Sequence, residues 1–257
     1  MHRDLEGRVA IVTGGSDGIG LASATLLARR GARVVICGRR QERLDLAKAA
    51  IAAEDGAVEA IRLDVSDFDA LAAMIANVGQ RHDRLDMLVN NAMSTHYAAI
   101  DRLTVDQWRK DFTVNADAAF VATKAAMRIM AQGGGGSIVN VASTCGIRAA
   151  ANMASYSASK AALVHFSAVA AMEGAPQGIR VNAVVPGQVQ TAGTEEFAAR
   201  APQIAARTAE AIPMGRGGRP EELARTIVFL LSDEASYVTG VALPVDGGKA
   251  AQLYMPS

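Results

Sequence analysis

The stretch Val9-Ala-Ile-Val-Thr-Gly-Gly-Ser-Asp-Gly-Ile-Gly20 decides the fold. Its first half is apolar and β-branched and predicts a buried strand, and the glycines that follow predict a tight turn opening a helix from about Ile19 to Arg30. Gly14, Gly18 and Gly20 would let the backbone approach a diphosphate closely, and the helix N-terminus offers free N–H groups to it. The segment therefore predicts a dinucleotide-binding turn, with an ordinary glycine-rich turn as the alternative.

The rest of the chain repeats this alternation of strand and helix. Strands are predicted at 33–37, 58–63, 85–90, 137–141, 179–184 and 241–245, and helices at 41–54, from 66, at 104–130 with a break near Thr113, and at 154–173. Gly31 is expected to end the first helix in a left-handed conformation, and Ser66 to cap the third. Apolar strands separated by helices indicate a parallel sheet covered on both faces, an α/β doubly wound fold of Rossmann type. We expect a single domain over residues 1–257, with a helical flap at about 188–218.

Composition excludes several classes of protein. Hydrophobic residues make up 50% of the 257, and 26 basic side chains balance 26 acidic ones. This balance gives no reason to expect nucleic acid or a membrane surface as a partner. The charged N-terminal residues, the absence of a long apolar run and the isolated Cys37 and Cys145 predict a cytoplasmic protein without a signal peptide, membrane span or disulfide framework. The four histidines have no ligand spacing, so no metal site is expected.

A second segment, Ala154-Ser-Tyr-Ser-Ala-Ser-Lys-Ala161, suggests acid/base chemistry. Tyr156 and Lys160 are four residues apart in a predicted helix, so their side chains share one face. An ammonium beside a phenol favours the phenolate, and we therefore expect the pKa of Tyr156 to be lowered toward neutrality. Such a tyrosine exchanges a proton with a carbonyl or alcohol oxygen near neutral pH. Taken alone, the pair is also typical of a solvated helix face.

The residues after the second strand predict the cofactor. Gly38 is followed by Arg39 and Arg40, where an acidic residue would accept the ribose hydroxyls of NAD. A guanidinium binds phosphate well, so NADP is favoured over NAD. Asp17 adds no affinity for a second phosphate, and a pair of solvated surface arginines is the alternative interpretation.

Together these motifs resemble the short-chain dehydrogenase/reductase family in its single-domain form, over nearly the whole chain. The resemblance implies a catalytic set of Asn115, Ser143, Tyr156 and Lys160. It implies a cofactor site of Gly14, Ser16, Asp17, Gly18, Ile19, Gly20, Arg39, Arg40, Asp64, Val65, Asn91, Ala92, Pro186, Gly187, Val189 and Thr191, with Tyr156 and Lys160. One departure is Met93, where the family has a glycine; if that position needs a positive φ, methionine would be strained there.

The resemblance also implies a mechanism, 4-pro-S hydride transfer between a nicotinamide cofactor and a carbonyl or secondary alcohol. Tyr156 would be the general acid or base, Lys160 would lower its pKa and hold the ribose, Ser143 would donate to the substrate oxygen, and Asn115 would anchor a proton-relaying water. The C-terminal part, 219–248, is similar to that of bacterial 3-oxoacyl carrier-protein reductases and of sugar, steroid and small-alcohol dehydrogenases. A 3-oxoacyl thioester or another ketone is therefore expected as the substrate.

Candidate substrate residues are Met93, Thr95, His96, Cys145, Arg148, Met153 and Gln188. A solvated loop histidine is the alternative for His96, and a mobile surface arginine for Arg148. The resemblance implies a homotetramer. Two other functions stay open: an NAD-linked alcohol, sugar or steroid dehydrogenase, and an NADP-binding regulator without turnover.

Overall fold

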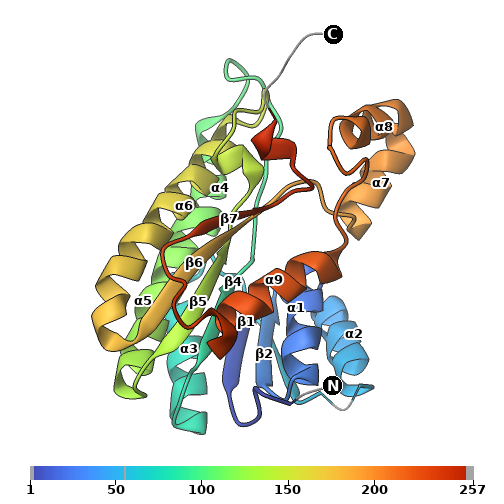
Figure 1. Ribbon diagram of the computed structural model, residues 1–257. Coiled ribbons are helices and arrows are strands. Elements are labelled where there is room, and N and C mark those ends of the chain that lie inside the picture. Colours follow the sequence, from blue (N-terminus) through green and yellow to red (C-terminus); the bar gives the residue numbers. More distant parts are fainter. Residues whose placement is uncertain (1–2, 55, 253–257) are drawn as a thin grey trace.

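The computed structural model describes residues 3–54 and 56–252. Within them one sheet of seven parallel strands runs in the order β3-β2-β1-β4-β5-β6-β7 (Figure 1). The strands are β1 (Val9–Thr13), β2 (Arg33–Gly38), β3 (Val58–Arg62), β4 (Met87–Asn90), β5 (Gly136–Val141), β6 (Ile179–Pro186) and β7 (Ala242–Val245). The predicted doubly wound α/β fold is confirmed. Because all strands are parallel, the loops that follow them lie along one edge of the sheet.

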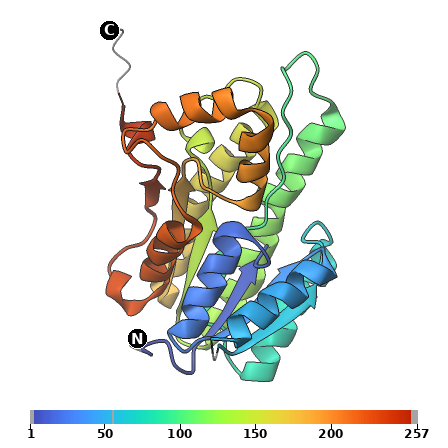
Figure 2. The same cartoon turned by 90° about the vertical axis from the view of Figure 1, so that its right-hand side faces the viewer.

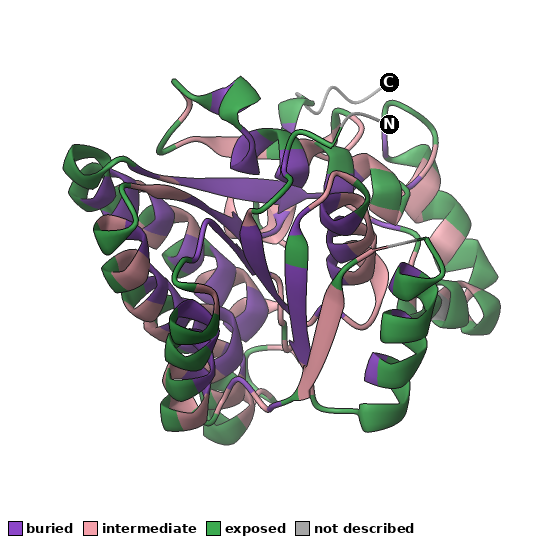
Figure 3. Cartoon of the chain, turned by 90° about the horizontal axis from the view of Figure 1, so that it is seen from below, coloured by how far each residue is buried: buried purple, intermediate pink, exposed green. Residues whose placement is uncertain are grey.

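Helices cover both faces of the sheet (Figures 1 and 2). On one face lie α1 (Gly18–Arg29), α2 (Gln41–Ala52) and α9 (Pro220–Leu231), and on the other α3 (Phe68–His82), α4 (Val105–Phe112), α5 (Ala118–Gln132) and α6 (Ala154–Gly174). Neighbouring strand residues pack into opposite layers: Ile11 lies in the core under α3 and α5, and Val12 in the core under α1 and α9. This alternation explains why the central strands are largely apolar on both faces, and Figure 3 shows burial concentrated on them, whereas the edge strands β3 and β7 are only partly buried.

Helix ends follow the predictions with one exception. Gly31 has a φ of 98°, and Thr104 begins α4 in a capping box with Gln107. The predicted cap at Ser66 is wrong, because the Asp67 side chain accepts from the backbone N–H of Ala70 at 3.0 Å and caps α3. The predicted break near Thr113 is a π-helical turn, 113–117, between α4 and α5.

The predicted helical flap contains two helices, α7 (Ala192–Arg200) and α8 (Pro202–Glu210), which project beyond the carboxyl edge of the sheet (Figures 1 and 2). Backbone hydrogen bonds of 2.8–2.9 Å between Gly218 and the 188–190 segment join the two ends of the segment that contains α7 and α8. The flap role stays a prediction. In the described part of the chain, no helix is long and apolar enough to cross a membrane.

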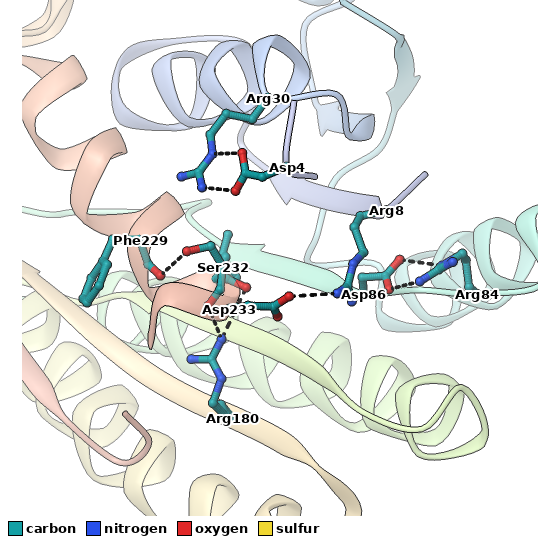
Figure 4. A network of polar contacts seen from close by, with 10 residues as sticks. Asp4, Arg8, Arg30, Arg84, Asp86, Arg180, Phe229, Ser232 and Asp233 are labelled. Atoms are coloured by element: carbon teal, nitrogen blue, oxygen red, sulfur yellow. Dashed lines mark hydrogen bonds and ion pairs between the residues drawn. The ribbon is translucent and has the colours of Figure 1, made fainter. Parts of the chain in front are cut away.

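A polar network fixes the amino edge of the sheet (Figure 4). Asp86, just before β4, accepts from the backbone N–H of Val9 at 2.8 Å and from both Arg84 and Arg8. Arg180 on β6 donates to the carbonyls of Leu230 at 2.6 Å and Ser232 at 2.9 Å, in the last turn of α9 and at its C-cap. These contacts hold the end of the sheet opposite to the predicted site.

Candidate active site

The first turn of α1 leaves no room for a side chain where it packs against the glycine turn that follows β1. A Cβ on Gly20 would lie 2.3 Å from the carbonyl oxygen of Gly14 and 2.4 Å from Nδ2 of Asn91. Gly14 and Gly18 have φ values of 63° and 51°, in the left-handed region. The Asp17 carboxylate caps α1 by accepting from the N–H of Gly18 at 2.8 Å. The turn predicted from the sequence is therefore present, and it leads directly into the N-terminus of α1.

This turn is tied to the segment after β4. The Asn91 amide donates to the carbonyls of Thr13 and Gly14 at 3.1 and 3.0 Å, and the Thr13 hydroxyl accepts from the N–H groups of Asn91 and Ala92 at 3.0 and 3.1 Å. Thr13 was not singled out in the sequence as a site residue. Because β1 and β4 are neighbours where the strand order reverses, the two segments border the crevice in which doubly wound sheets bind ligands.

The loop after β2 carries two basic side chains, and the loop after β3 carries the acidic Asp64. Arg39 and Arg40 are exposed. Burial acts to raise the pKa of Asp64, but hydrogen bonds from Ser66 and the positive charges of Lys110 and Arg39 outweigh it and lower that pKa. Ser66 donates to Asp64 through its N–H at 3.0 Å and its hydroxyl at 2.7 Å. Asp64 is thus an ionised carboxylate, held by Ser66 and lying near the positive charges of Arg39 and Lys110. The sequence analysis did not predict Lys110 at this position.

Met93 occupies its turn without backbone strain. Among the described residues other than glycine, only Asp83 and Asn152 have a positive φ. Met93 is 51% exposed. The strain that a left-handed backbone would have caused there is absent, so the departure from the family's glycine changes the surface of the turn rather than its conformation.

Ser143, Tyr156 and Lys160 come together beyond the carboxyl end of β5. All three residues are buried, and the Tyr156 phenol is hydrogen-bonded to Ser143. The Ser143 hydroxyl also accepts from the N–H of Cys145 at 3.1 Å. The Lys160 ammonium donates to the carbonyl of Val141 at 2.7 Å and stands 5.8 Å from the centre of the Tyr156 ring.

The expected low pKa of Tyr156 is wrong for this arrangement. Burial raises the pKa of Tyr156 to about 12, with the hydrogen bond to Ser143 opposing the rise. Burial also lowers the pKa of Lys160 to about 8. The physical reason is that the ammonium is directed at a strand carbonyl and not at the phenol oxygen. The phenol therefore keeps its proton near neutral pH.

Asn115 lies in the π-helical turn with its side chain fully engaged. Its oxygen accepts from the N–H of Ser94 at 2.8 Å, and its amide donates to the Ser94 carbonyl at 2.8 Å and to Ser159 Oγ at 2.9 Å. The side chain therefore links the segment after β4 to α6, the helix that carries Tyr156 and Lys160. Ser94 and Ser159 act here as its partners.

His96 is not the solvated loop histidine offered as its alternative. Its Nδ1 lies 2.8 Å from Oδ1 of Asp111, whose side chain is completely buried. Oδ2 of Asp111 accepts from the His96 N–H at 3.2 Å and from Ser155 Oγ at 2.6 Å. Sequence reasoning missed Asp111, although its spacing of four residues from Asn115 places both on one helix face.

The other candidate substrate residues divide into three groups. Thr95 Oγ1 and Gln188 Oε1 are buried without a hydrogen-bond partner among the described residues, so both are available to a ligand. Arg148 is exposed and donates to the carbonyl of Ile147 at 2.9 Å, in agreement with a surface arginine. Cys145 Sγ lies 3.9 Å from the Met153 sulfur.

The residues after β6 complete the edge. A Cβ on Gly18 would lie 3.0 Å from Cγ2 of Thr191, so Thr191 borders the glycine turn, and Val189 is buried. A Cβ on Gly187, which follows Pro186, would lie 2.8 Å from Cβ of Asp246. The cradle of glycines, the helix N-terminus and the unpaired buried polar atoms fit a dinucleotide with a nicotinamide end. In the described residues, no group of histidine, cysteine and carboxylate side chains is arranged to hold a metal.

Comparisons with known proteins match nearly the whole chain. The family described as enoyl-(acyl carrier protein) reductase matches residues 14–250. The 3-oxoacyl-[acyl-carrier-protein] reductase of Thermotoga maritima is 40% identical over 245 residues, 95% of this chain and 98% of that protein.

Two solved structures share this fold. One, from Beutenbergia cavernae, is provisionally assigned as an NAD(P)-dependent gluconate 5-dehydrogenase and contains NADP; its TM-score is 0.92 at 38% identity, covering 98% of this chain and 100% of that one. An NAD⁺-bound xylitol dehydrogenase has a TM-score of 0.91 at 31% identity, covering 95% and 99%. The names of these relatives give different substrates, and the two structures contain NADP and NAD⁺ respectively.

Proposed function

The chain belongs to the short-chain dehydrogenase/reductase family, and on that premise we propose that it transfers hydride between NADP(H) and a ketone or secondary alcohol, with Tyr156 as the acid or base. Family membership makes it an oxidoreductase of alcohol and carbonyl substrates. The observation that supports the further assignment is the buried phenol of Tyr156, hydrogen-bonded to Ser143 beside Lys160 at the edge that carries the glycine turn.

Each residue has a role that its chemistry supports. The nicotinamide, when bound, supplies or takes up the hydride. Tyr156 gives its proton to the carbonyl oxygen in reduction, which the raised pKa of the phenol does not prevent because proton donation needs the neutral form. Ser143 donates to the same oxygen while negative charge develops on it. The Asn115 side chain is bonded to Ser94 and Ser159 and would hold the segment after β4 against α6, and its water-anchoring role stays a prediction.

Removing the Tyr156 hydroxyl tests this assignment. Tyr156→Phe is expected to lower kcat by about 10²–10⁴-fold, the usual contribution of a general acid. Nucleotide affinity, measured by NADPH fluorescence, should stay within about threefold, because the glycine turn is untouched. Tyr237→Phe, at a fully exposed position, is the matched control. Near wild-type turnover by Tyr156→Phe would refute the role.

The choice of NADP rests on Arg39 and Arg40 after β2. No carboxylate stands at those two positions, and a guanidinium there can pair with a ribose phosphate. Arg39→Ala should raise KM for NADPH at least about tenfold and leave KM for NADH nearly unchanged, whereas Arg81→Ala, at the end of α3, should change neither. Equal effects on both cofactors would favour an NAD-linked dehydrogenase.

The ketone substrate is proposed as a 3-oxoacyl thioester or another small ketone. Consumption of NADPH and NADH with 3-oxoacyl thioesters, cyclic ketones and sugars separates these classes. Tight nucleotide binding without turnover of any of them would favour an NADP-binding regulator.

We also propose assembly into a homotetramer, with α5 and α6 in one interface. Phe120, Val169 and Met172 are exposed on these helices, and Ala161 and Ala162 on α6 would allow a partner helix to approach closely. Sedimentation velocity should give a species larger than the monomer, and Met172→Glu should weaken it. A monomer at micromolar concentration would contradict this. A cytoplasmic location stays a prediction.

A further inference from the structure

The carboxylate of Asp111 fixes which nitrogen of His96 carries the proton. A carboxylate only accepts hydrogen bonds, and Oδ1 of Asp111 lies 2.8 Å from Nδ1 of His96. In the neutral imidazole the proton is therefore on Nδ1, and Nε2 is left as an acceptor. The Asp111 side chain is fully buried while that of His96 is 31% exposed, so the accessible edge is the one away from Asp111.

His96 borders the residues proposed for the chemistry. Two residues before it, Ser94 is bonded to Asn115, and two residues after it, the N–H of Ala98 donates to the carbonyl of Asn152 at 3.0 Å. The segment thus runs from Asn115 to the start of the catalytic helix α6. Ser155, which donates to Asp111, directly precedes Tyr156. The His96 imidazole is therefore held against the end of α6 that carries the phenol.

We propose that His96 determines substrate specificity by accepting, through Nε2, a hydrogen bond from a second hydroxyl group of the substrate. The inference rests on the proposed function and narrows it to polyols, diols and hydroxyketones. A fixed acceptor favours a substrate that carries a hydroxyl donor over one that carries hydrogen at the same position. Asp111 is the positioning residue that keeps the acceptor in this state.

One variant should move the imidazole proton of His96 to the other ring nitrogen while keeping the histidine. Oδ2 of Asp111 accepts from both Ser155 and the His96 N–H, so in Asp111→Asn the amide oxygen must occupy that place. The amide nitrogen then faces Nδ1 and donates to it. The proton moves to Nε2, and the acceptor that faces the substrate becomes a donor.

The test compares kcat/KM for cyclohexanol with that for the isomeric 1,2- and 1,3-cyclohexanediols. For the wild type, at least one diol should exceed cyclohexanol by about tenfold, the effect of one hydrogen bond to a partly exposed group. His96→Leu and Asp111→Asn should each reduce this ratio toward one. His96→Gln, whose amide oxygen can accept the same bond, should keep part of it, and Tyr237→Phe should keep all of it.

A second readout needs no turnover. Imidazole ¹⁵N shifts at alkaline pH should show the His96 proton on Nδ1 in the wild type and on Nε2 in Asp111→Asn, with His96→Gln identifying the resonance. A wild-type proton on Nε2 overturns the inference. The inference is also overturned if the enzyme turns over cyclohexanol and the diols and His96→Leu leaves the ratio of their kcat/KM values unchanged. In that case the proposed function still holds. Absence of turnover of every alcohol with NADP and NAD overturns the proposed function and the inference together.

Discussion

Replacing Lys160 by methionine measures the cost of burying an ammonium beneath the active site. Lys160 is 2% exposed, and its bond to the carbonyl of Val141 at 2.7 Å is the contact that opposes desolvation. Burial lowers its pKa from 10.5 to about 8. At about 1.4 kcal/mol per unit, this difference corresponds to at most about 3.5 kcal/mol of unfolding free energy.

The sign of the effect follows from proton binding. The folded-state pKa is depressed, so between about pH 8 and 10.5 the unfolded chain holds more protons at this site than the folded protein. The unfolding free energy therefore rises with pH through this window, and the penalty is fully present below pH 8. Lys160→Met removes this dependence, so the stability of the wild type relative to the variant should increase by up to about 3 kcal/mol from pH 7 to 10.5.

Urea unfolding followed by circular dichroism at fixed protein concentration gives this difference. Cys37, whose pKa is raised to about 12 by burial, contributes an opposite slope in both proteins and cancels. Lys48→Met, at an exposed position on α2, is the control and should run parallel to the wild type. Parallel curves for Lys160→Met as well would refute the depressed pKa.

Three further outcomes follow from single contacts. Gly20→Ala should weaken NADPH binding at least about tenfold and lower the free energy of unfolding by about 1–3 kcal/mol, because its Cβ would meet the Gly14 carbonyl. Gly193→Ala, with open space around it, is the control and should change neither quantity. Tight NADPH binding by Gly20→Ala would contradict the proposed glycine turn as the nucleotide site. Asp86→Ala should lower the unfolding free energy measured in urea by about 3 kcal/mol, because it removes a buried carboxylate from its arginine partners. Arg81→Ala removes an exposed ion pair with Glu59 and should lower the same free energy by less than about 0.5 kcal/mol. Similar losses in the two variants would contradict the difference expected between buried and exposed ion pairs. Thr104→Ala should cost about 1 kcal/mol in the same assay through the lost capping box, and an unchanged midpoint would speak against that cap.

Local sequence signals predicted most of the fold. The apolar run before Gly14 and the glycine after α1 specify their own conformations, since a positive φ and a Cβ-free approach leave little choice of residue. Helix ends were less certain where two capping residues adjoin: Ser66 and Asp67 are both good caps, and the Ser66 hydroxyl is used by Asp64 instead.

Side-chain direction inside the site could not be predicted. The spacing of Tyr156 and Lys160 gives a shared helix face, but which acceptor the ammonium takes depends on the position of β5 relative to α6, a tertiary relation. His96 and Asp111 are separated by 15 residues and meet only because the segment after β4 folds back on α4. A polar residue on a helix face that also carries Asn115 was the one available signal.

The packing of α9 on α1 has a consequence for synthesis on the ribosome. Leu223, Ile227 and Val228 fill the layer that also contains Leu27, nearly 200 residues earlier in the chain, and Arg180 holds the end of α9 through carbonyl groups (Figures 1 and 4). Until α9 has left the exit tunnel, the side of α1 that packs against α9 has no cover, and these contacts are among the most distant in sequence. We expect nascent chains that stop before α9 to expose this apolar layer and to be the species that chaperones bind.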